Sequence, residues 1–152
     1  MHISLYFVPF SVKRALPMIT RMDHFTLVSD NLDATRQFYV EVLGLAEGPR
    51  PPFPVPGFWL YAGEHPVLHV VGVTQMPEPR RGVLDHMAFR AEGLARTWLI
   101  LERYGIRFSV VRAPGAERTW QLFMQDPNGA EVELDFDATE LPPADWKTRL
   151  ER

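Results

Sequence analysis

Cysteine is absent from this 152-residue chain, and neither sign of charge dominates. Without thiols the chain can form neither a disulfide scaffold nor a thiolate zinc site. Its 16 basic and 19 acidic residues give a formal net charge of −3. This composition offers no basic stripe for a run of phosphates, so a nucleic-acid partner is not expected. Metal binding and acid–base chemistry would therefore depend on the five histidines and the carboxylates.

Long apolar runs are also absent. The run at residues 3–10 is short, contains Pro9, and is followed by Lys13 and Arg14 instead of being preceded by them. That order fits neither a secretory signal nor a membrane span of about 20 apolar residues. We therefore expect residues 1–20 to be an N-terminal extension, with an added edge strand as the alternative. We also expect a cytoplasmic protein with no membrane partner.

Proline, unlike cysteine, is abundant in this chain. The chain has 14 prolines, about twice the usual share, which favours short strands and turns over long helices. Five of them fall within residues 48–57, so this segment is predicted to be an extended loop. The total length predicts a single domain.

The sequence from residue 22 onward contains two similar halves. At an offset of 62, the pair Asp23-His24 aligns with Asp85-His86. In the first half we predict strands at residues 24–28, 58–61 and 66–73. We also predict a helix at residues 31–45, with Asp30 as its N-cap. In the second half, strands are predicted at residues 107–112, 119–125 and 131–136.

This repeat predicts an α+β fold of two tandem βαβββ modules. The modules span about residues 22–74 and 83–136, so the domain covers 22–136 and a C-terminal tail covers 137–152. Equivalent positions in two such halves can face one another across the sheet.

Four residues at repeat-equivalent positions carry the predicted chemistry. His24 and His86 open the first strand of each half, and Glu133 lies on the last strand of the second half. His69 is the first-half counterpart of Glu133, because it follows His24 by nearly the same spacing. His24, His86 and Glu133 can supply three ligands to a divalent Fe, Mn, Ni, Co or Zn ion and leave positions open. His69 could be a fourth ligand, an acid or base, or a histidine satisfied by the backbone.

Aromatic and polar residues near these positions form a candidate substrate pocket. A pocket wall of aromatic side chains with an arginine would suit a small anionic or aromatic oxygenated molecule. The alternative is that most of these aromatic residues belong to the hydrophobic core. The candidates are Arg50, Phe53, Trp59 and Tyr61 in the first half, and Gln121 and Phe123 in the second.

Several short motifs together resemble the vicinal oxygen chelate superfamily, which includes glyoxalase I, extradiol dioxygenases and bleomycin-binding proteins. The motifs are Asp23-His24-Phe25, Phe38-Tyr39 before Leu43-Gly44-Leu45, Asp85-His86-Met87-Ala88-Phe89, and Asp126-Pro127-Asn128-Gly129 leading to Glu133-Leu134. The resemblance implies a cupped mixed sheet around one metal ion and a homodimer. It also implies that His24, His86 and Glu133 are the metal ligands.

The resemblance leads to a functional hypothesis with two alternatives. We predict a metal-dependent glyoxalase-like lyase or isomerase, whose small substrate chelates the ion through two adjacent oxygens while His69 or Glu133 handles a proton. A ferrous extradiol (catechol) dioxygenase is the first alternative; His69 would suit its acid–base step, but Phe123 stands where those enzymes commonly have a tyrosine. The second is a non-catalytic resistance protein that binds a drug or metabolite.

Overall fold

The computed structural model describes residues 21–80, 82–114 and 118–150. The extension predicted for residues 1–20 lies outside this part of the chain. Among the described residues, no helix has the length and apolar character needed to cross a membrane.

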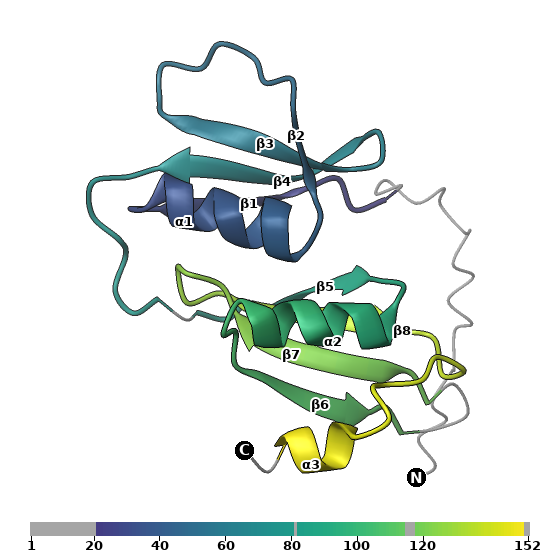
Figure 1. Cartoon of the computed structure of the whole chain (residues 1–152). Coiled ribbons are helices and arrows are strands. Elements are labelled where there is room, and N and C mark those ends of the chain that lie inside the picture. The colour runs from purple at the N-terminus through teal and green to yellow at the C-terminus, as the bar shows by residue number, and fades with distance from the viewer. Residues whose placement is uncertain (1–20, 81, 115–117, 151–152) are drawn as a thin grey trace, which may run out of the picture.

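The described chain folds into two α+β modules, which confirms the predicted fold class. Figure 1 shows the modules one above the other, with the linker between β4 and β5 running along one side. The first module consists of β1 (Phe25–Ser29), α1 (Leu32–Arg36), η1 (Gln37–Val42), β2 (Ala46–Gly48), β3 (Gly57–Ala62) and β4 (His65–Gly72). The second consists of β5 (His86–Arg90), α2 (Leu94–Arg103), β6 (Phe108–Arg112), β7 (Trp120–Gln125) and β8 (Glu131–Phe136), followed by α3 (Trp146–Leu150).

Each module forms a four-stranded mixed sheet with the same topology. The strand orders are β1-β4-β3-β2 and β5-β8-β7-β6, and only the first pair in each order is parallel. Thr26 pairs with His69 in the first sheet, and Ala88 pairs with Glu133 in the second. Thr26 and Ala88 each lie two residues after their module's first histidine. The register therefore confirms that His69 is the counterpart of Glu133.

Alternation along the strands gives each sheet a helix-covered face and an open face. On β8, Val132 and Leu134 are buried in the core, whereas Glu131, Glu133 and Asp135 lie on the opposite face. The helices fill the covered side with Phe38, Tyr39, Val42, Leu94, Trp98 and Leu101. The open faces are therefore left to carry the predicted site residues.

The first helix differs from its predicted form. Instead of one α-helix over residues 31–45, a short α1 leads into the π-helix η1, in which the Leu43 N–H donates to the Phe38 carbonyl at 3.0 Å. The N-cap is Asn31, whose side chain accepts a hydrogen bond from the Ala34 N–H. The prediction of Asp30 was wrong by one residue, because Asn and Asp are nearly equal as N-caps and local sequence does not rank adjacent candidates.

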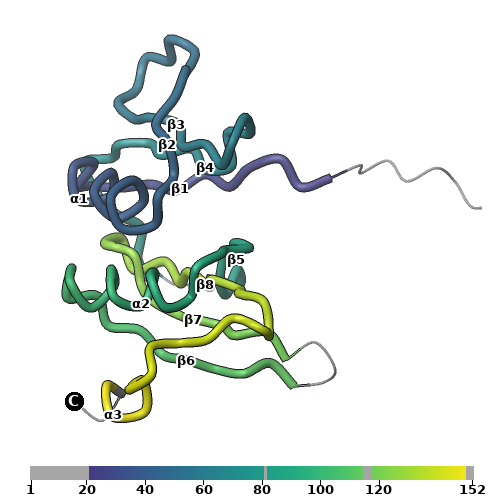
Figure 2. The backbone as a smooth tube through the Cα atoms, turned by 45° about the vertical axis from the view of Figure 1, so that its right-hand side comes forward, coloured from purple at the N-terminus to yellow at the C-terminus, as the bar shows by residue number. Residues whose placement is uncertain are grey.

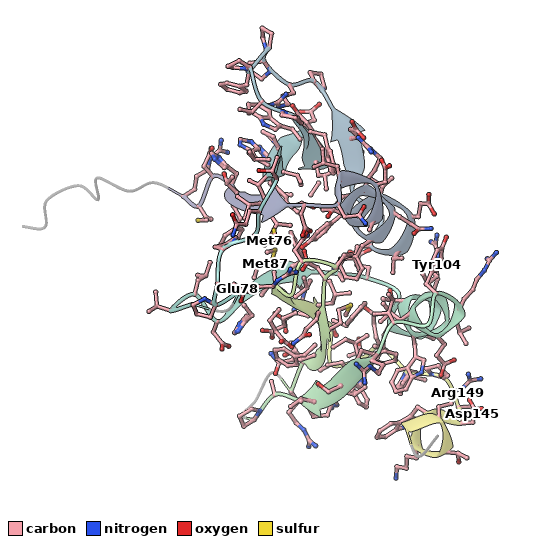
Figure 3. The ribbon with its side chains drawn as sticks, turned by 90° about the vertical axis from the view of Figure 1, so that its left-hand side faces the viewer. Met76, Glu78, Met87, Tyr104, Asp145 and Arg149 are labelled. Carbon is pink, nitrogen blue, oxygen red and sulfur yellow. The ribbon has the colours of Figure 1, made fainter. Side chains whose placement is uncertain are left out.

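The modules meet where the turn between β7 and β8 docks on the first-module helices. The Tyr39 hydroxyl donates to Asp126 Oδ2 at 3.0 Å, and the Asn128 side-chain amide donates to Thr35 Oγ1 at 3.0 Å. Met87 of β5, which lies between the modules in Figure 3, contacts the same tyrosine hydroxyl. Because a buried polar group without a partner costs about 1–3 kcal/mol, these hydrogen bonds favour one orientation of the modules.

The segment after β8 packs back onto the second module. The Glu140 carboxylate accepts hydrogen bonds from backbone N–H groups at the start of α2, including that of Leu94 at 2.6 Å. The Trp146 ring makes edge-on contacts with Trp98 and Trp120. As a result α3 covers one end of this module's core, beside β6 (Figure 1).

Candidate functional site

The open face of the first sheet carries three stacked rings, which we call the first half-site: His24, Trp59 and His69. His24 lies just before β1, Trp59 on β3 and His69 on β4. The His69 ring lies between the other two, with centroids 3.7 Å from His24 and 3.8 Å from Trp59. Its Nε2 atom is buried and has no hydrogen-bond partner among the described residues. That nitrogen therefore keeps its capacity to bond to an entering molecule.

A groove of about 440 Å³ adjoins the first half-site, and its lining is mainly apolar. The lining residues are His24, Thr26, Phe53, Val55, Trp59, His69 and Val71. Phe53 and Val55 belong to the proline-rich loop between β2 and β3, which extends away from the second module in Figure 2. In this chain the loop therefore borders the first sheet alone.

Two of the predicted substrate residues hold this loop in place. The Arg50 guanidinium donates to the Val55 carbonyl at 2.9 Å and lies over the Phe53 ring. The Tyr61 hydroxyl donates to the Pro49 carbonyl at 2.6 Å. Their polar groups are therefore already engaged within the loop.

The open face of the second sheet carries a polar cluster, the second half-site: His86, Gln121, Glu133 and Asp135. His86 Nε2 lies 2.9 Å from Glu133 Oε2. The Gln121 side-chain amide donates to Glu133 Oε1 and, at 3.1 Å, to Asp135 Oδ1. Phe123 contributes the edge of a ring next to the His86 imidazole. Glu133 is only 4% exposed, so these contacts satisfy a buried carboxylate.

The half-sites shift the pKa values of their groups in different directions. Burial lowers the pKa of His69, assisted by the neighbouring His24, so His69 is neutral at pH 7. The hydrogen bond to Asp85 raises the pKa of His86, and the Glu133 charge acts in the same direction. Burial raises the pKa of Glu133, with a further increase from the Asp135 charge. The pKa values thus disfavour positive charge on His69 and favour it on His86.

The structure brings the predicted ligands together as two pairs rather than one set. His24 stacks with His69 on the first sheet, and His86 contacts Glu133 on the second. Within residues 21–80, 82–114 and 118–150, no three His, Asp or Glu side chains converge as a metal site. In a single chain, therefore, the donor types needed for a metal ion are present, but they are distributed over two open faces.

Sequence reasoning missed the partners of these histidines. Asp23 Oδ2 lies 2.7 Å from His24 Nδ1, and Asp85 Oδ2 lies 2.8 Å from His86 Nδ1. The available signal was the repeat of the Asp-His pair at both module starts. The contact between Asp135 and Gln121 was also missed, since cross-strand pairing is not visible before the register is known.

Comparison with known proteins agrees with this architecture. The family model for the Glyoxalase/Bleomycin resistance protein/Dioxygenase superfamily matches residues 21–134. The chain therefore belongs to this superfamily. A search of curated proteins found no match.

Solved structures share the fold at low sequence identity. A glyoxalase family protein from Bacillus anthracis is 21% identical with a TM-score of 0.67, covering 81% of this chain and 99% of that one. A lactoylglutathione lyase from Agrobacterium tumefaciens is 22% identical with a TM-score of 0.59, covering 79% and 96%. A glyoxalase family protein from Enterococcus faecalis is 28% identical with a TM-score of 0.58, covering 76% and 96%.

Proposed function

We propose that this protein is a metal-dependent glyoxalase-like lyase or isomerase. Its substrate would be a small molecule that chelates a divalent ion through two adjacent oxygens. The observation that carries the proposal is that His24 and His86 have the same surroundings. Each has its Nδ1 against an aspartate, which leaves Nε2 for a ligand role, and the buried Glu133 lies beside one of them. A bound divalent ion would polarise the two substrate oxygens and stabilise negative charge developing on them.

We propose that the metal ligands His24, His86 and Glu133 come together between two copies of the chain. The first half-site of one copy would face the second half-site of the other, giving a homodimer with two sites. This arrangement would place an apolar groove opposite a polar cluster. It is supported by the position of the two pairs on different sheets of one chain and by the open face that each sheet presents.

His69 is the group we assign to proton transfer, and Glu133 is the second candidate for it. A neutral imidazole accepts a proton, and the lowered pKa of His69 keeps it neutral near pH 7. Phe53 and Trp59 would line the apolar side of the substrate pocket, and Gln121 and Phe123 the opposite side. Arg50 and Tyr61 would act indirectly, by holding the loop.

A ferrous extradiol dioxygenase is the second candidate. The observation that favours it is the composition of the ligand set, because two histidines and one carboxylate are also the ligands of many non-haem iron oxygenases. His69 would then act on a catechol hydroxyl.

Metal uptake tests both enzyme proposals at once. We expect purified protein incubated with Mn²⁺, Fe²⁺, Co²⁺, Ni²⁺ or Zn²⁺ and then desalted to retain about one ion per chain, measured by elemental analysis. His86→Ala should abolish uptake because it removes a ligand and a partner of Glu133. The matched control is His65→Ala, which removes an exposed histidine at the start of β4. Unchanged stoichiometry in His86→Ala would refute its ligand role.

Reaction assays then separate the two enzymes from a binding protein. Metal-loaded protein in D₂O should exchange the proton next to the carbonyl of α-hydroxyketones or of methylglyoxal hemithioacetals, followed by NMR. Ring cleavage of catechols by the ferrous form would instead support the dioxygenase. Stoichiometric metal uptake with neither reaction would contradict both and leave a binding protein.

A further inference from the structure

An aspartate immediately precedes each histidine that we propose as a metal ligand. Asp23 and Asp85 occupy equivalent places in the repeat, and the aspartate–histidine distances of 2.7 and 2.8 Å are nearly the same. Adjacent residues within a strand point to opposite faces, so such a contact is not available inside a regular strand. Here Asp23 lies before β1 and Asp85 before β5, which allows each carboxylate to turn back onto its neighbour.

The direction of these hydrogen bonds defines the state of each ring. An ionised carboxylate can only accept, so the proton in each contact must belong to Nδ1 of the imidazole. With Nδ1–H held in this way, Nε2 is the nitrogen that can bind an ion. In His86 this nitrogen faces the Glu133 carboxylate at 2.9 Å, so an ion bound there would replace any proton that the two groups share. Histidine ligands in metalloproteins are commonly held by a carboxylate on the other ring nitrogen, which orients the ring and raises its basicity.

The exposure of the two aspartates argues against a mainly structural role. Their side chains are 71% and 88% exposed, and exposed ion pairs contribute little to folding stability. The same contact nevertheless occurs at both module starts. A role in orienting the imidazoles accounts for the repetition better than a contribution to stability does.

We propose that Asp23 and Asp85 are positioning residues that hold Nδ1–H of His24 and His86 and direct Nε2 toward the metal ion. This inference rests on the proposed function, because it assumes that the two histidines are ligands.

For His86 the geometry makes a specific prediction. Its two ring nitrogens face two carboxylates, with Asp85 on Nδ1 and Glu133 on Nε2. Removing the Asp85 carboxylate should leave Glu133 as the remaining acceptor, so a neutral ring would carry its proton on Nε2. A metal ion would then have to displace that proton from the nitrogen it binds.

The first experiment uses metal-free protein and NMR of ¹⁵N-labelled histidine side chains near pH 7.5. In the native sequence we expect Nδ1 of both His24 and His86 to carry a proton. In Asp85→Ala the His86 proton should be found on Nε2. In Asp23→Ala the His24 proton should no longer favour Nδ1 over Nε2. An unprotonated Nδ1 in either ring of the native protein would overturn the inference, whether or not the protein binds metal.

The second experiment measures Co²⁺ and Zn²⁺ affinity by titration. Asp23→Ala and Asp85→Ala should each weaken binding about 10- to 100-fold, and the Asn variants, which keep an acceptor without charge, should weaken it less. The control is Asp33→Ala, which removes an aspartate that is 97% exposed and paired with Arg36. Thermal stability of all the variants should remain near that of the control.

The outcomes separate this inference from the proposed function. Affinities within twofold of Asp33→Ala would contradict the positioning role while leaving the metal site intact. Failure of the native protein to bind any ion would refute the proposed function. The NMR measurement would then still decide whether the aspartates hold the two rings.

Discussion

His69 is the residue whose role depends most on its surroundings. His69 occupies the position in the first module that Glu133 occupies in the second. The structure places its ring between His24 and Trp59 and leaves Nε2 buried without a partner in the described chain. Rings packed on both faces limit its rotation, and burial keeps it neutral. These properties make His69 better suited to act as a base than a mobile histidine on the surface would be.

We predict that His69→Ala reduces catalysis without removing the metal. Loss of a positioned general base typically lowers the rate about 10²- to 10⁴-fold. Metal stoichiometry should be unchanged, because the proposed ligands His24, His86 and Glu133 remain. Proton exchange and metal content should be measured on the same preparation, with His65→Ala as the control. If metal is lost together with the rate, His69 is a ligand instead.

At the scale of elements, the two modules contact each other through the π-helix η1 and the turn between β7 and β8. The wider turn of η1 places Phe38, Tyr39 and Val42 in the core. The Tyr39 hydroxyl then reaches Asp126 in the turn between β7 and β8. Helical periodicity predicted a helix in this region, but it did not distinguish a π-helix, since that depends on which backbone carbonyls the packing leaves available.

We predict that Tyr39 makes the protein sensitive to alkaline pH. Burial, with the Asp126 charge, raises the pKa of Tyr39 well above its usual value. Above about pH 10 the unfolded chain loses this proton while the folded chain keeps it, so the free energy of unfolding falls as pH rises. The contribution is fully present below pH 10, and each further pH unit should cost up to about 1.4 kcal/mol.

Tyr39→Phe tests this contribution by denaturant unfolding at pH 8 and pH 11. At pH 8 the variant should be less stable by about 1–3 kcal/mol, because Asp126 loses a buried hydrogen bond. At pH 11 the difference from the native protein should be clearly smaller, because the variant has no phenol to titrate. An equal difference at both pH values would contradict the assignment.

At the scale of the whole molecule, the two half-sites lie on separate sheets. Both sheets have the same strand order, and each keeps an open face opposite its helix. The aromatic and apolar groups gather on the first sheet, whereas the carboxylates gather on the second. The proposed site between two copies would bring these two kinds of surface together.

Mixed dimers test that arrangement directly. We predict that His24→Ala and His86→Ala chains bind no metal alone but recover one site per dimer when co-expressed. Each mixed dimer would contain one pairing in which both mutated positions fall in the same site, and one in which neither does. Two affinity tags allow the mixed dimer to be purified and its metal content measured. A metal-free mixed dimer, or a purely monomeric protein, would contradict a shared site.

The sequence alone determined the two-module fold and the equivalence of His24 with His86 and of His69 with Glu133. Periodicity and the repeat were enough for this, because alternation along a strand and the spacing of the repeat are both properties of the order of residues in the chain. Tertiary structure decided which of these side chains meet. It stacks His69 on Trp59, directs Arg50 to a loop carbonyl, and keeps His24 and Glu133 on different sheets. The stacking of His69 on Trp59 follows from the pairing of β3 with β4, and the Arg50 hydrogen bond follows from the conformation of the loop between β2 and β3. The relative placement of the two sheets depends on contacts between the modules, such as that between Tyr39 and Asp126. None of these contacts is encoded by a pattern of residue types along the chain.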